Sequence, residues 1–424
     1  MSLRWDSDAV PARLSLDRAA SALTALTVFL VLAVSSLMLA RFGISYEEAG
    51  GPGWQKIHPA TLSATAAMLA MALARGNPVS FLEDILKRQP EVLAFTAMLV
   101  LMTLYVLWRV GAPVTQFVDT FLLPVFLFVA MTRQSESWMC AMALFVHGFM
   151  AANALLGLAE FTAGFRVTPL VAEGVEITTD WRSTALLGHP LLNAAATATY
   201  AHMLLIGGGR DIPVWVRIPA FLLQAAAMIA FGGRAATVLL ILFAIPALVV
   251  AIWGFRGSYR MTPAAAGGLV LCAMVGLALL AMLVSGGFFD KFLGRFLDDG
   301  GSAAARSSMF DVLWALTPEM LLFGSDPDYV ASLQRQAGIP FGIESFWVAL
   351  VAYQGLLFSI PFFAMFFVFL NGLRKWAIPG SAWNILLFLL IISTSTSLSS
   401  KTAMLSVFVV AFCLLLRLAP ARVE

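Results

Sequence analysis

Charge is what this sequence has least of. Only 12% of its 424 residues are charged, whereas 60% are hydrophobic; ordinary soluble chains carry roughly 25% charged residues. A soluble domain of this length has no way to bury so much apolar surface, so we predict that the surrounding solvent is lipid. No basic run exceeds Lys87-Arg88 and the formal net charge is only +2, which argues against a nucleic-acid partner.

Cysteine and metal-binding patterns are also scarce. Cys140, Cys272 and Cys413 lie in apolar runs without metal-ligand spacing, so we expect packing residues, with no disulfide and no zinc. The sequence has no P-loop, no dinucleotide-binding fingerprint, no zinc motif and no Asp-rich metal signature. We therefore predict that the protein uses no metal and no cofactor.

Long apolar runs, in contrast, are abundant. About twelve of them approach the roughly 20 apolar residues that a helix needs to cross a bilayer. We therefore predict an all-α polytopic membrane protein in which residues 1–424 form one membrane domain. The predicted spans are 20–40, 58–74, 92–108, 113–131, 138–159, 185–206, 214–231, 235–253, 263–285, 345–370, 382–394 and 402–418.

The loops between these runs give the predicted orientation. With the N-terminus inside, the inner loops carry Arg75, Lys87, Arg88, Arg133, Arg210, Arg256, Arg260, Arg374, Lys375, Arg417 and Arg422. The outer loops are acidic and carry Glu47, Glu48, Glu160, Glu173, Glu176 and Asp180. This asymmetry follows the positive-inside rule, and an even number of spans places both termini in the cytoplasm. Two outer segments, 160–184 and 286–344, are longer than simple connections.

The outer segment 286–344 is predicted to contain two amphipathic helices. Over 288–299, apolar and charged residues recur at helical spacing, as in a helix that lies on the outer leaflet. Gly300-Gly301 interrupts this pattern. A second helix is expected to begin near 302–306 and to end around Phe323-Gly324, where Ser325-Asp326-Pro327 supplies turn chemistry.

Two arginines on the outer side are candidate ligands for an anionic group. Arg234 ends the tight turn Gly232-Gly233-Arg234, where glycines let a ligand approach closely and a guanidinium can grip phosphate with two hydrogen bonds. Arg306 opens the second outer helix. The alternatives are a snorkelling arginine at a helix end for Arg234 and a solvated surface residue for Arg306. Two arginines that converge on one group would stabilise a pyrophosphate leaving group.

A second cluster precedes the sixth predicted span. Gly188-His189-Pro190 is followed by Asn193, and Arg182 lies shortly before it. The proline frees a backbone carbonyl, and the alanines that follow allow close helix packing. The cluster as a whole favours substrate binding. His189 taken alone is better explained as a buried, hydrogen-bonded histidine in a kinked helix.

Glu344 lies in Gly342-Ile343-Glu344-Ser345, where the chain re-enters the membrane. A carboxylate at this boundary is partly desolvated, and the catalytic role that fits it is that of general base. The alternative is a helix N-terminal residue that complements the helix dipole. The other ionisable residues near the bilayer are interpreted as structural: Asp119 as a bundle partner, His147 and His202 as helix–helix hydrogen-bond residues, and Lys401 as an anchor of the last span.

Residues from about 150 to 400 resemble the O-antigen ligase/polymerase superfamily of bacterial envelope enzymes, whereas the first 150 residues match only in being spans. Four features carry the resemblance in order. The first is the outer loop from Glu160 to Arg182, which leads into Gly188-His189-Pro190 and Asn193, and the second is Gly233-Arg234-Ala235, which matches the family's Ser-Arg-Gly-like signature. The third is Arg306 with Trp314 and Phe323-Gly324-Ser325, and the fourth is Gly342-Ile343-Glu344-Ser345 followed by Tyr353-Gln354-Gly355-Leu356.

Members of this superfamily look like metal-independent glycosyltransferases that act at the periplasmic face of the bacterial inner membrane. The resemblance implies that Arg234 and Arg306 hold the diphosphate of an undecaprenyl-diphosphate-linked oligosaccharide, with Arg182 as a third contact. Glu344 would take the proton from the acceptor hydroxyl. The implied partners are this lipid-linked glycan, the bilayer, and assembly proteins such as a flippase and a chain-length regulator.

Three functions remain open from the sequence. Ligases of the superfamily typically carry a histidine where this chain has Glu344-Ser345, which favours a polymerase of exopolysaccharide repeat units. The first alternative is a ligase that transfers finished glycan to a lipid or protein. The second is a polysaccharide transporter or flippase, although transporters usually show internal repeats and binding groups near the midplane.

Overall fold

The structure, a computed structural model, describes residues 9–47, 51–110, 114–172, 175–255, 302–339, 342–394 and 400–418, with residues 284, 285, 287, 289, 290, 293, 294 and 398. The regular secondary structure of these residues is helical apart from one short ladder, in which Val171–Ala172 (β1) pairs antiparallel with Val175–Glu176 (β2). The predicted all-α fold class is confirmed. The predicted span over 263–285 and the amphipathic helix over 288–299 lie almost entirely outside the described residues.

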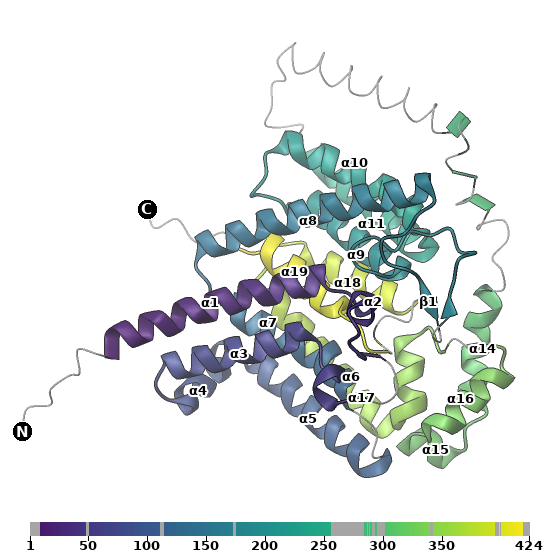
Figure 1. Ribbon diagram of the computed structural model, residues 1–424, viewed down its shortest axis with the longest axis horizontal. Helices are drawn as coiled ribbons and strands as arrows, with labels where there is room; N and C mark the ends of the chain where they lie inside the picture. The colour runs from purple at the N-terminus through teal and green to yellow at the C-terminus, as the bar shows by residue number, and fades with distance from the viewer. Residues whose placement is uncertain are drawn as a thin grey trace, which may run out of the picture.

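The predicted span 20–40 is divided, because one helix ends at Ala33 and a separate short helix begins at Ser36. Most of the other helices lie close to predicted spans. Val214–Phe231, for example, matches the predicted 214–231 at both ends. In chain order (Figure 1), the elements are α1 (Ala9–Ala33), α2 (Ser36–Arg41), η1 (Gly53–Lys56), α3 (Pro59–Ala74), α4 (Pro78–Arg88), α5 (Pro90–Val110), α6 (Thr115–Phe117), η2 (Val118–Leu122), α7 (Leu123–Met131), α8 (Glu136–Ala163), α9 (Pro190–Leu205), α10 (Val214–Phe231), α11 (Arg234–Phe255), α14 (Ser302–Trp314), α15 (Pro318–Phe323), α16 (Pro327–Gln336), α17 (Phe346–Lys375), α18 (Ser381–Ile392) and α19 (Met404–Leu415).

Several helices fit a lipid bilayer. Within the described part of the chain, five are long and apolar enough to cross one: α1 over Ser15–Ala33, α5, α8, α10 and α17. Shorter apolar helices accompany them, over Pro59–Ala74, Thr115–Met131, Arg234–Val249, Ser381–Ile392 and Met404–Leu415. Leucines and tryptophans are exposed along the outer faces of these helices, as expected for surfaces that contact lipid.

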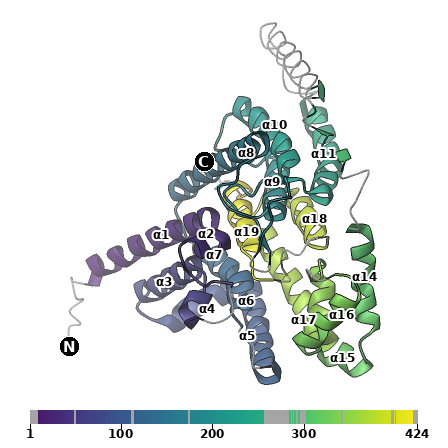
Figure 2. The same ribbon diagram turned by 45° about the vertical axis from the view of Figure 1, so that its right-hand side comes forward.

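The helix ends gather on two opposite sides of the molecule. On one side, Arg417 after α19 pairs with Glu136 at the start of α8, at 3.1 Å, and with Asp211 in the α9–α10 loop, at 2.7 Å. We term this the terminal side, because α1 also begins there and α19 ends there (Figure 1). The opposite side, termed the loop side, carries the β1–β2 ladder (Figure 1) and the helices α14 and α16 (Figures 1 and 2).

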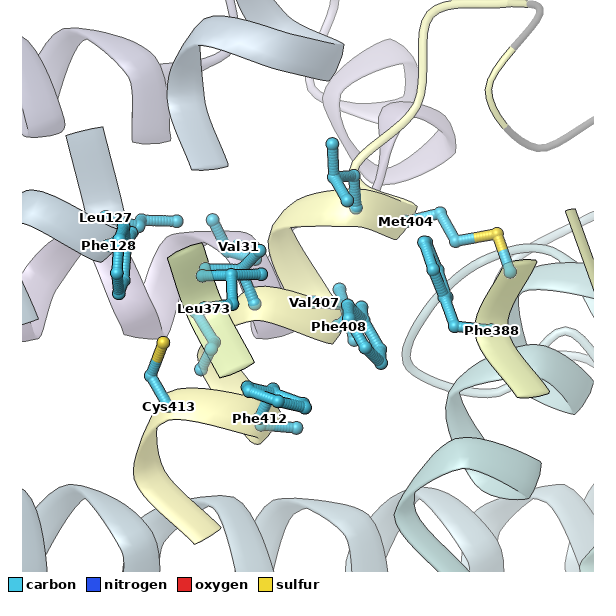
Figure 3. Close-up of a cluster of buried hydrophobic side chains, with 14 of the residues drawn as sticks. Val31, Leu127, Phe128, Leu373, Phe388, Met404, Val407, Phe408, Phe412 and Cys413 are labelled. Carbon is cyan, nitrogen blue, oxygen red and sulfur yellow. The ribbon is translucent and has the colours of Figure 1, made fainter. Parts of the chain in front are cut away.

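Helix α19 forms the centre of the core. All twelve of its residues are buried. Figure 3 shows side chains of α1, α7, α17 and α18 around it, among them Val31, Phe128, Leu373 and Phe388. The rings of Phe388 and Phe408 stack with their centroids 4.0 Å apart. A helix that is apolar on every face is predicted to be surrounded on every side, and α19 is surrounded by protein.

Helix α17 is broken and folded back on itself. Gly355 has φ 76° and ψ 163°, a conformation that is open in practice only to glycine. The Phe346 ring, before the break, lies with its centroid 6.0 Å from that of Phe366, after the break. The two halves of α17 therefore run side by side. The sequence had predicted one span over 345–370, and the structure gives a helical hairpin over that segment.

The outer segment before α17 holds three short helices. Thr317 caps α15 by accepting a hydrogen bond from the Met320 amide at 3.3 Å, and Pro318 occupies the first position of that helix. The single helix predicted from 302–306 to Phe323-Gly324 is therefore wrong: its start is right, but α14 ends at Trp314 and α15 follows. Helix α16 was not predicted.

The turn after α15 is locked into the break in α17. Gly324 adopts φ 87° and ψ 163°, again a region reserved for glycine. A Cβ on Gly324 would lie 2.5 Å from the Tyr353 carbonyl oxygen, and a Cβ on Gly355 would lie 2.3 Å from the Gly324 nitrogen. The Ser325 amide donates to the Ala352 carbonyl at 3.1 Å. Two of the motifs that carried the family resemblance thus touch directly.

The end of α5 secures both parts of this lock. The Tyr105 hydroxyl donates to the Phe323 carbonyl, and the Arg109 guanidinium donates to the Tyr353 carbonyl. The Tyr105 ring also stacks on Phe358, with centroids 3.7 Å apart. The outer helices are therefore fixed to the bundle, and with them the segment that leads to Glu344.

Candidate functional site

A turn of π-helix, η2, organises the loop side of the bundle. It lies between α6 and α7, and three consecutive residues in it, Asp119, Thr120 and Phe121, are buried. Each of the three holds a different segment of the chain in place. Single π-helical turns are rare in proteins, but those that occur are often found at functional sites. The surroundings of η2 are therefore the first place to look for a site.

Asp119 gathers hydrogen-bond donors from the segment that joins α2 to α3. Its carboxylate accepts from the Tyr46 hydroxyl at 2.9 Å, from the His58 amide at 3.1 Å and from the Thr61 hydroxyl at 2.7 Å. The Lys401 ammonium lies 3.7 Å from the same carboxylate. The sequence interpretation of Asp119 as a bundle partner agrees with these contacts, because a buried carboxylate is stable only when it is paired in this way.

Lys401 joins the chain before α19 to the same network. Its ammonium donates to the carbonyl of Tyr46 at 3.1 Å and to that of Lys56, and it lies 3.6 Å from the centroid of the Tyr46 ring. Burial lowers the pKa of Lys401, while the Asp119 carboxylate opposes that shift. Burial and the same carboxylate raise the pKa of Tyr46. Lys401 therefore acts as an anchor, as predicted, although of a loop as well as of the last helix.

Thr120 and Phe121 hold two further segments. The Thr120 hydroxyl donates to the Ser400 carbonyl at 3.3 Å and accepts from the Thr402 amide at 3.1 Å. The Phe121 ring lies 5.9 Å, centroid to centroid, from Phe346, which directly follows Glu344-Ser345. The loop before α19 and the re-entry segment of Glu344 are thus both docked on one helical turn.

A cavity of about 230 Å³ opens beside this network. Its polar wall includes Ser35, Glu47, His189, Ser400 and Lys401. Its apolar wall includes Val31, Leu187 and Leu191. The cavity therefore brings together the break between α1 and α2, the start of α9 and the loop before α19. Of the predicted site residues, His189 lines it.

Glu160 shapes the loop that carries His189. The sequence placed this residue at the start of an outer loop over 160–184, but α8 continues to Ala163 and Glu160 is buried. Its carboxylate accepts from the Thr184 and Ala185 amides at 3.0 and 2.9 Å and from the Ser183 hydroxyl at 2.5 Å. Ala185 has φ 38°, a left-handed value that is uncommon for alanine, and the Glu160 contact stabilises it.

Asn193 is a positioning residue. It was predicted to bind substrate, but it is fully buried. Its amide nitrogen donates to the carbonyls of Thr184 and His189 at 2.6 and 3.0 Å, and its amide oxygen accepts from Asn153 at 2.8 Å. The prediction of direct contact with substrate does not fit this geometry, because both ends of the amide are used inside the protein. Asn193 instead fixes the chain on either side of Gly188.

Arg182 lies against the turn that precedes Arg234. A Cβ on Gly232 would be only 2.8 Å from Cγ of Arg182, so the arginine side chain crosses this turn at van der Waals distance. Its guanidinium pairs with Asp180, with Nε to Oδ2 at 2.8 Å. The charge of Arg182 is therefore compensated by Asp180. In the structure, the Arg182 side chain packs on the Gly232-Gly233-Arg234 turn.

Arg234 is brought next to the start of α9 by its glycines. A Cβ on Gly233 would be 2.3 Å from Cβ of Ala194, so only glycine lets the turn come this close to α9. Arg182, His189 and Arg234 thus cluster around the first turns of one helix. The side chain of Arg306 lies outside the described residues, although its backbone belongs to α14.

Glu344 is partly buried, beside a segment that α14 holds. The Ser345 amide donates to the Met309 sulfur of α14 at 3.2 Å, and Ile343 packs into the same small core. The Trp347 indole donates to the Ser393 hydroxyl at the end of α18 at 2.6 Å. Glu344 therefore lies just before the start of α17, in a segment held by α14 and by the end of α18.

The remaining histidines bear out their structural interpretation. His147 of α8 hydrogen-bonds to the Tyr200 hydroxyl of α9 at 2.8 Å, and His202 of α9 to Asn384 of α18 at 3.0 Å. Sequence reasoning missed the positioning roles of Glu160 and Asn153. A carboxylate and an amide on one face of α8 near its outer end were the only signal for them.

No protein-family model, no curated protein and no solved structure matches this chain.

Proposed function

We propose that this protein is a membrane glycosyltransferase that polymerises polysaccharide repeat units. In this proposal the donor is an oligosaccharide on undecaprenyl diphosphate, the acceptor is a sugar hydroxyl, and the reaction takes place on the loop side. The observation that supports it most is the cluster of Arg182, His189 and Arg234 around the start of α9, of which His189 lines the cavity. These residues come from two segments that the family resemblance singled out, the first with Arg182 and His189 and the second with Arg234.

Arg234 and Arg306 are the proposed ligands of the diphosphate. Departure of a diphosphate from the anomeric carbon requires stabilisation of its developing charge, and guanidinium groups supply this without a metal. Arg182 supports the Arg234 turn through its packing on Gly232. Its pair with Asp180 leaves it as a weaker phosphate ligand than the sequence had suggested.

Glu344 is the proposed general base. It would accept the proton of the acceptor hydroxyl while that oxygen attacks the anomeric carbon. Its position suits the role in two respects: it is partly buried, and its neighbours Ser345 and Phe346 are held by α14 and η2. A base has to be fixed relative to the reacting atoms to be effective.

The membrane arrangement is part of the proposal. The shorter apolar helices are proposed to cross the bilayer with the longer ones, for about twelve spans in all, as the sequence predicts. The terminal side would then face the cytoplasm of a bacterium and the loop side the periplasm. Basic residues on the terminal side, among them Arg75, Arg88 and Arg374, support this orientation.

Replacement of Arg234 by alanine is expected to abolish polymer formation while protein levels in the membrane stay normal. The physical reason is the loss of the guanidinium that stabilises the leaving diphosphate. Polymer is measured by gel electrophoresis of cell-surface polysaccharide, and Arg306→Ala is expected to behave alike. The matched control is Arg335→Ala, an exposed arginine of α16 on the same side. Full-length polymer in both the Arg234 and the Arg306 variant would refute the clamp.

Replacement of Glu344 by glutamine is expected to leave the protein folded and nearly inactive, because the amide has the size of the carboxylate but cannot take a proton. Turnover is measured in membranes supplied with lipid-linked repeat units. Glu319→Gln, on the exposed face of α15, serves as the control. Wild-type turnover in Glu344→Gln would remove this residue from the mechanism.

The accumulated product separates the polymerase from a ligase. Loss of a polymerase leaves single repeat units on the lipid carrier, whereas loss of a ligase leaves long chains that are not attached to their acceptor. Mass spectrometry of the lipid-linked glycans in a deletion strain therefore decides between the two. We expect single units.

A further inference from the structure

Two helices of the bundle begin with the same two residues, histidine and proline. His58-Pro59 starts α3, and His189-Pro190 starts α9. In both, the histidine is the N-cap and its Nδ1 accepts a hydrogen bond from the amide two residues on: from Ala60 at 3.1 Å and from Leu191 at 3.2 Å. A nitrogen that accepts such a bond carries no proton, so both imidazoles are held as the tautomer with hydrogen on Nε2.

The two histidines differ in what their Nε2–H meets. His58 is buried and donates to the Val34 carbonyl at 3.0 Å. His189 is exposed and lines the cavity, and no described residue accepts a hydrogen bond from its Nε2. His58 therefore uses its Nε2–H within the protein, although its side chain also lines the cavity. His189 presents a donor of fixed tautomer to whatever occupies the cavity.

The charges around the cavity balance. The Lys401 ammonium is surrounded by the Asp119 carboxylate, by Glu47 and by Lys56, all of which affect its pKa. Among the described residues, these two positive and two negative side chains balance, so they give no net charge to attract an anion. The wall itself alternates between hydroxyl groups, such as those of Ser35 and Ser400, and aliphatic side chains, such as Leu187. This mixture suits an uncharged ring that carries hydroxyls on its edge and C–H groups on its faces.

We propose that this cavity binds a single sugar ring, with the Nε2–H of His189 donating to one of its hydroxyl oxygens and the Glu47 carboxylate accepting from another. The volume of about 230 Å³ is below that of sites for drug-sized ligands, which run from about 300 to 1,000 Å³, and so fits one ring and not a chain. The inference rests on the proposed function and makes the cavity the subsite for the acceptor sugar.

Protection of His189 from chemical modification tests the proposal. The full chain, in nanodiscs free of sugar-based detergent, is treated with diethyl pyrocarbonate, and modification of each histidine is followed by mass spectrometry. His189 is expected to react fastest, because His58, His147 and His202 are buried. A panel of glucose, galactose, mannose, rhamnose and N-acetylglucosamine is then added, with inorganic pyrophosphate as a separate arm.

At least one sugar is expected to slow modification of His189, by about tenfold at about ten times its Kd. Pyrophosphate is expected to have no effect. Glu47→Ala should weaken the protection without changing the reactivity of His189 in the free protein, whereas Glu83→Ala, on α4 at the terminal side, should leave both unchanged. The proposal is overturned if no sugar protects, if pyrophosphate protects as well as a sugar does, or if His189 is no more reactive than His58.

This outcome is independent of polymer synthesis. Protection by a sugar combined with full-length polymer in both Arg234→Ala and Arg306→Ala would leave sugar binding in the cavity standing and remove the proposed diphosphate clamp. Loss of polymer in Arg234→Ala without protection by any sugar would support the proposed clamp and remove the assignment of the cavity as a sugar site.

Discussion

Replacing Gly355 by alanine is expected to prevent the fold-back of α17 and to abolish activity with it. The backbone conformation alone costs a non-glycine residue about 1–3 kcal/mol. The added Cβ would also lie 2.3 Å from the Gly324 nitrogen and 2.4 Å from the Leu322 carbonyl oxygen, both backbone atoms that cannot swing aside. The lock between α15 and α17 must therefore open, and Glu344 loses the support of its segment.

Two measurements test this expectation. Thermal unfolding of the purified protein should show a large loss of stability for Gly355→Ala. A short thiol crosslinker between cysteines placed at Trp347 and Phe363, whose rings are 4.8 Å apart, should join the two halves of α17 in the parent protein only. Gly338→Ala is the matched control, because Gly338 has φ 71° but a Cβ added to it would have no atom within 4 Å. Efficient crosslinking in Gly355→Ala would show that the hairpin does not depend on this glycine.

Replacing Asp119 by alanine is expected to destabilise the protein by about 3–5 kcal/mol, the usual cost of removing one partner from a buried ion pair. The Lys401 ammonium would lose its counter-ion, and the Tyr46 and Thr61 hydroxyls would lose their acceptor. Because these groups join α3, the α2–α3 segment and the chain before α19, the loop side should open as a unit. Thermal unfolding and protease sensitivity of the segment around Tyr46 report the change.

A double replacement separates the charge from the shape. Asp119→Leu combined with Lys401→Met removes both charges and is expected to be more stable than Asp119→Leu alone, since an apolar pair leaves no buried ion without its partner. If Asp119→Ala unfolds at the temperature of the parent protein, the network around η2 does not hold the loop side together.

Most of the helices could be predicted because apolar runs of helical length are visible directly in the sequence. Apolar runs of helical length gave the positions of most helices, and α10 matches its predicted range at both ends. The break in α17 could not be read in the same way. Gly355 sits in an apolar run like any glycine in a membrane helix, and only the contact with Gly324, far away in the sequence, requires its unusual backbone.

The site was predicted in part for a related reason. His189 and Arg234 stood out because histidine and arginine are costly near a bilayer. Their supporting residues did not stand out, because their role depends on partners that the sequence does not pair. Glu160 looked like one more acidic loop residue, yet it is buried and receives the amides of Thr184 and Ala185. Asn193 looked like a substrate ligand because the sequence does not show that its amide is hydrogen-bonded to Asn153, Thr184 and His189.

The short central helix α19 has a consequence for how deep the loop side reaches. Its twelve residues span about 18 Å at 1.5 Å per residue, against about 30 Å for the hydrocarbon layer. Protein surrounds α19 on every side, so the bilayer has no reason to thin around it. In the proposed arrangement, with Arg417 at the membrane surface of the terminal side, the missing length falls at the Lys401 end. It then places the polar floor of the cavity, formed by Ser400 and Lys401, below the plane of the lipid headgroups. A substrate tethered to a long lipid would meet this floor with its tail still immersed, and would avoid the roughly 0.8 kcal/mol that each CH₂ costs when it is drawn into water.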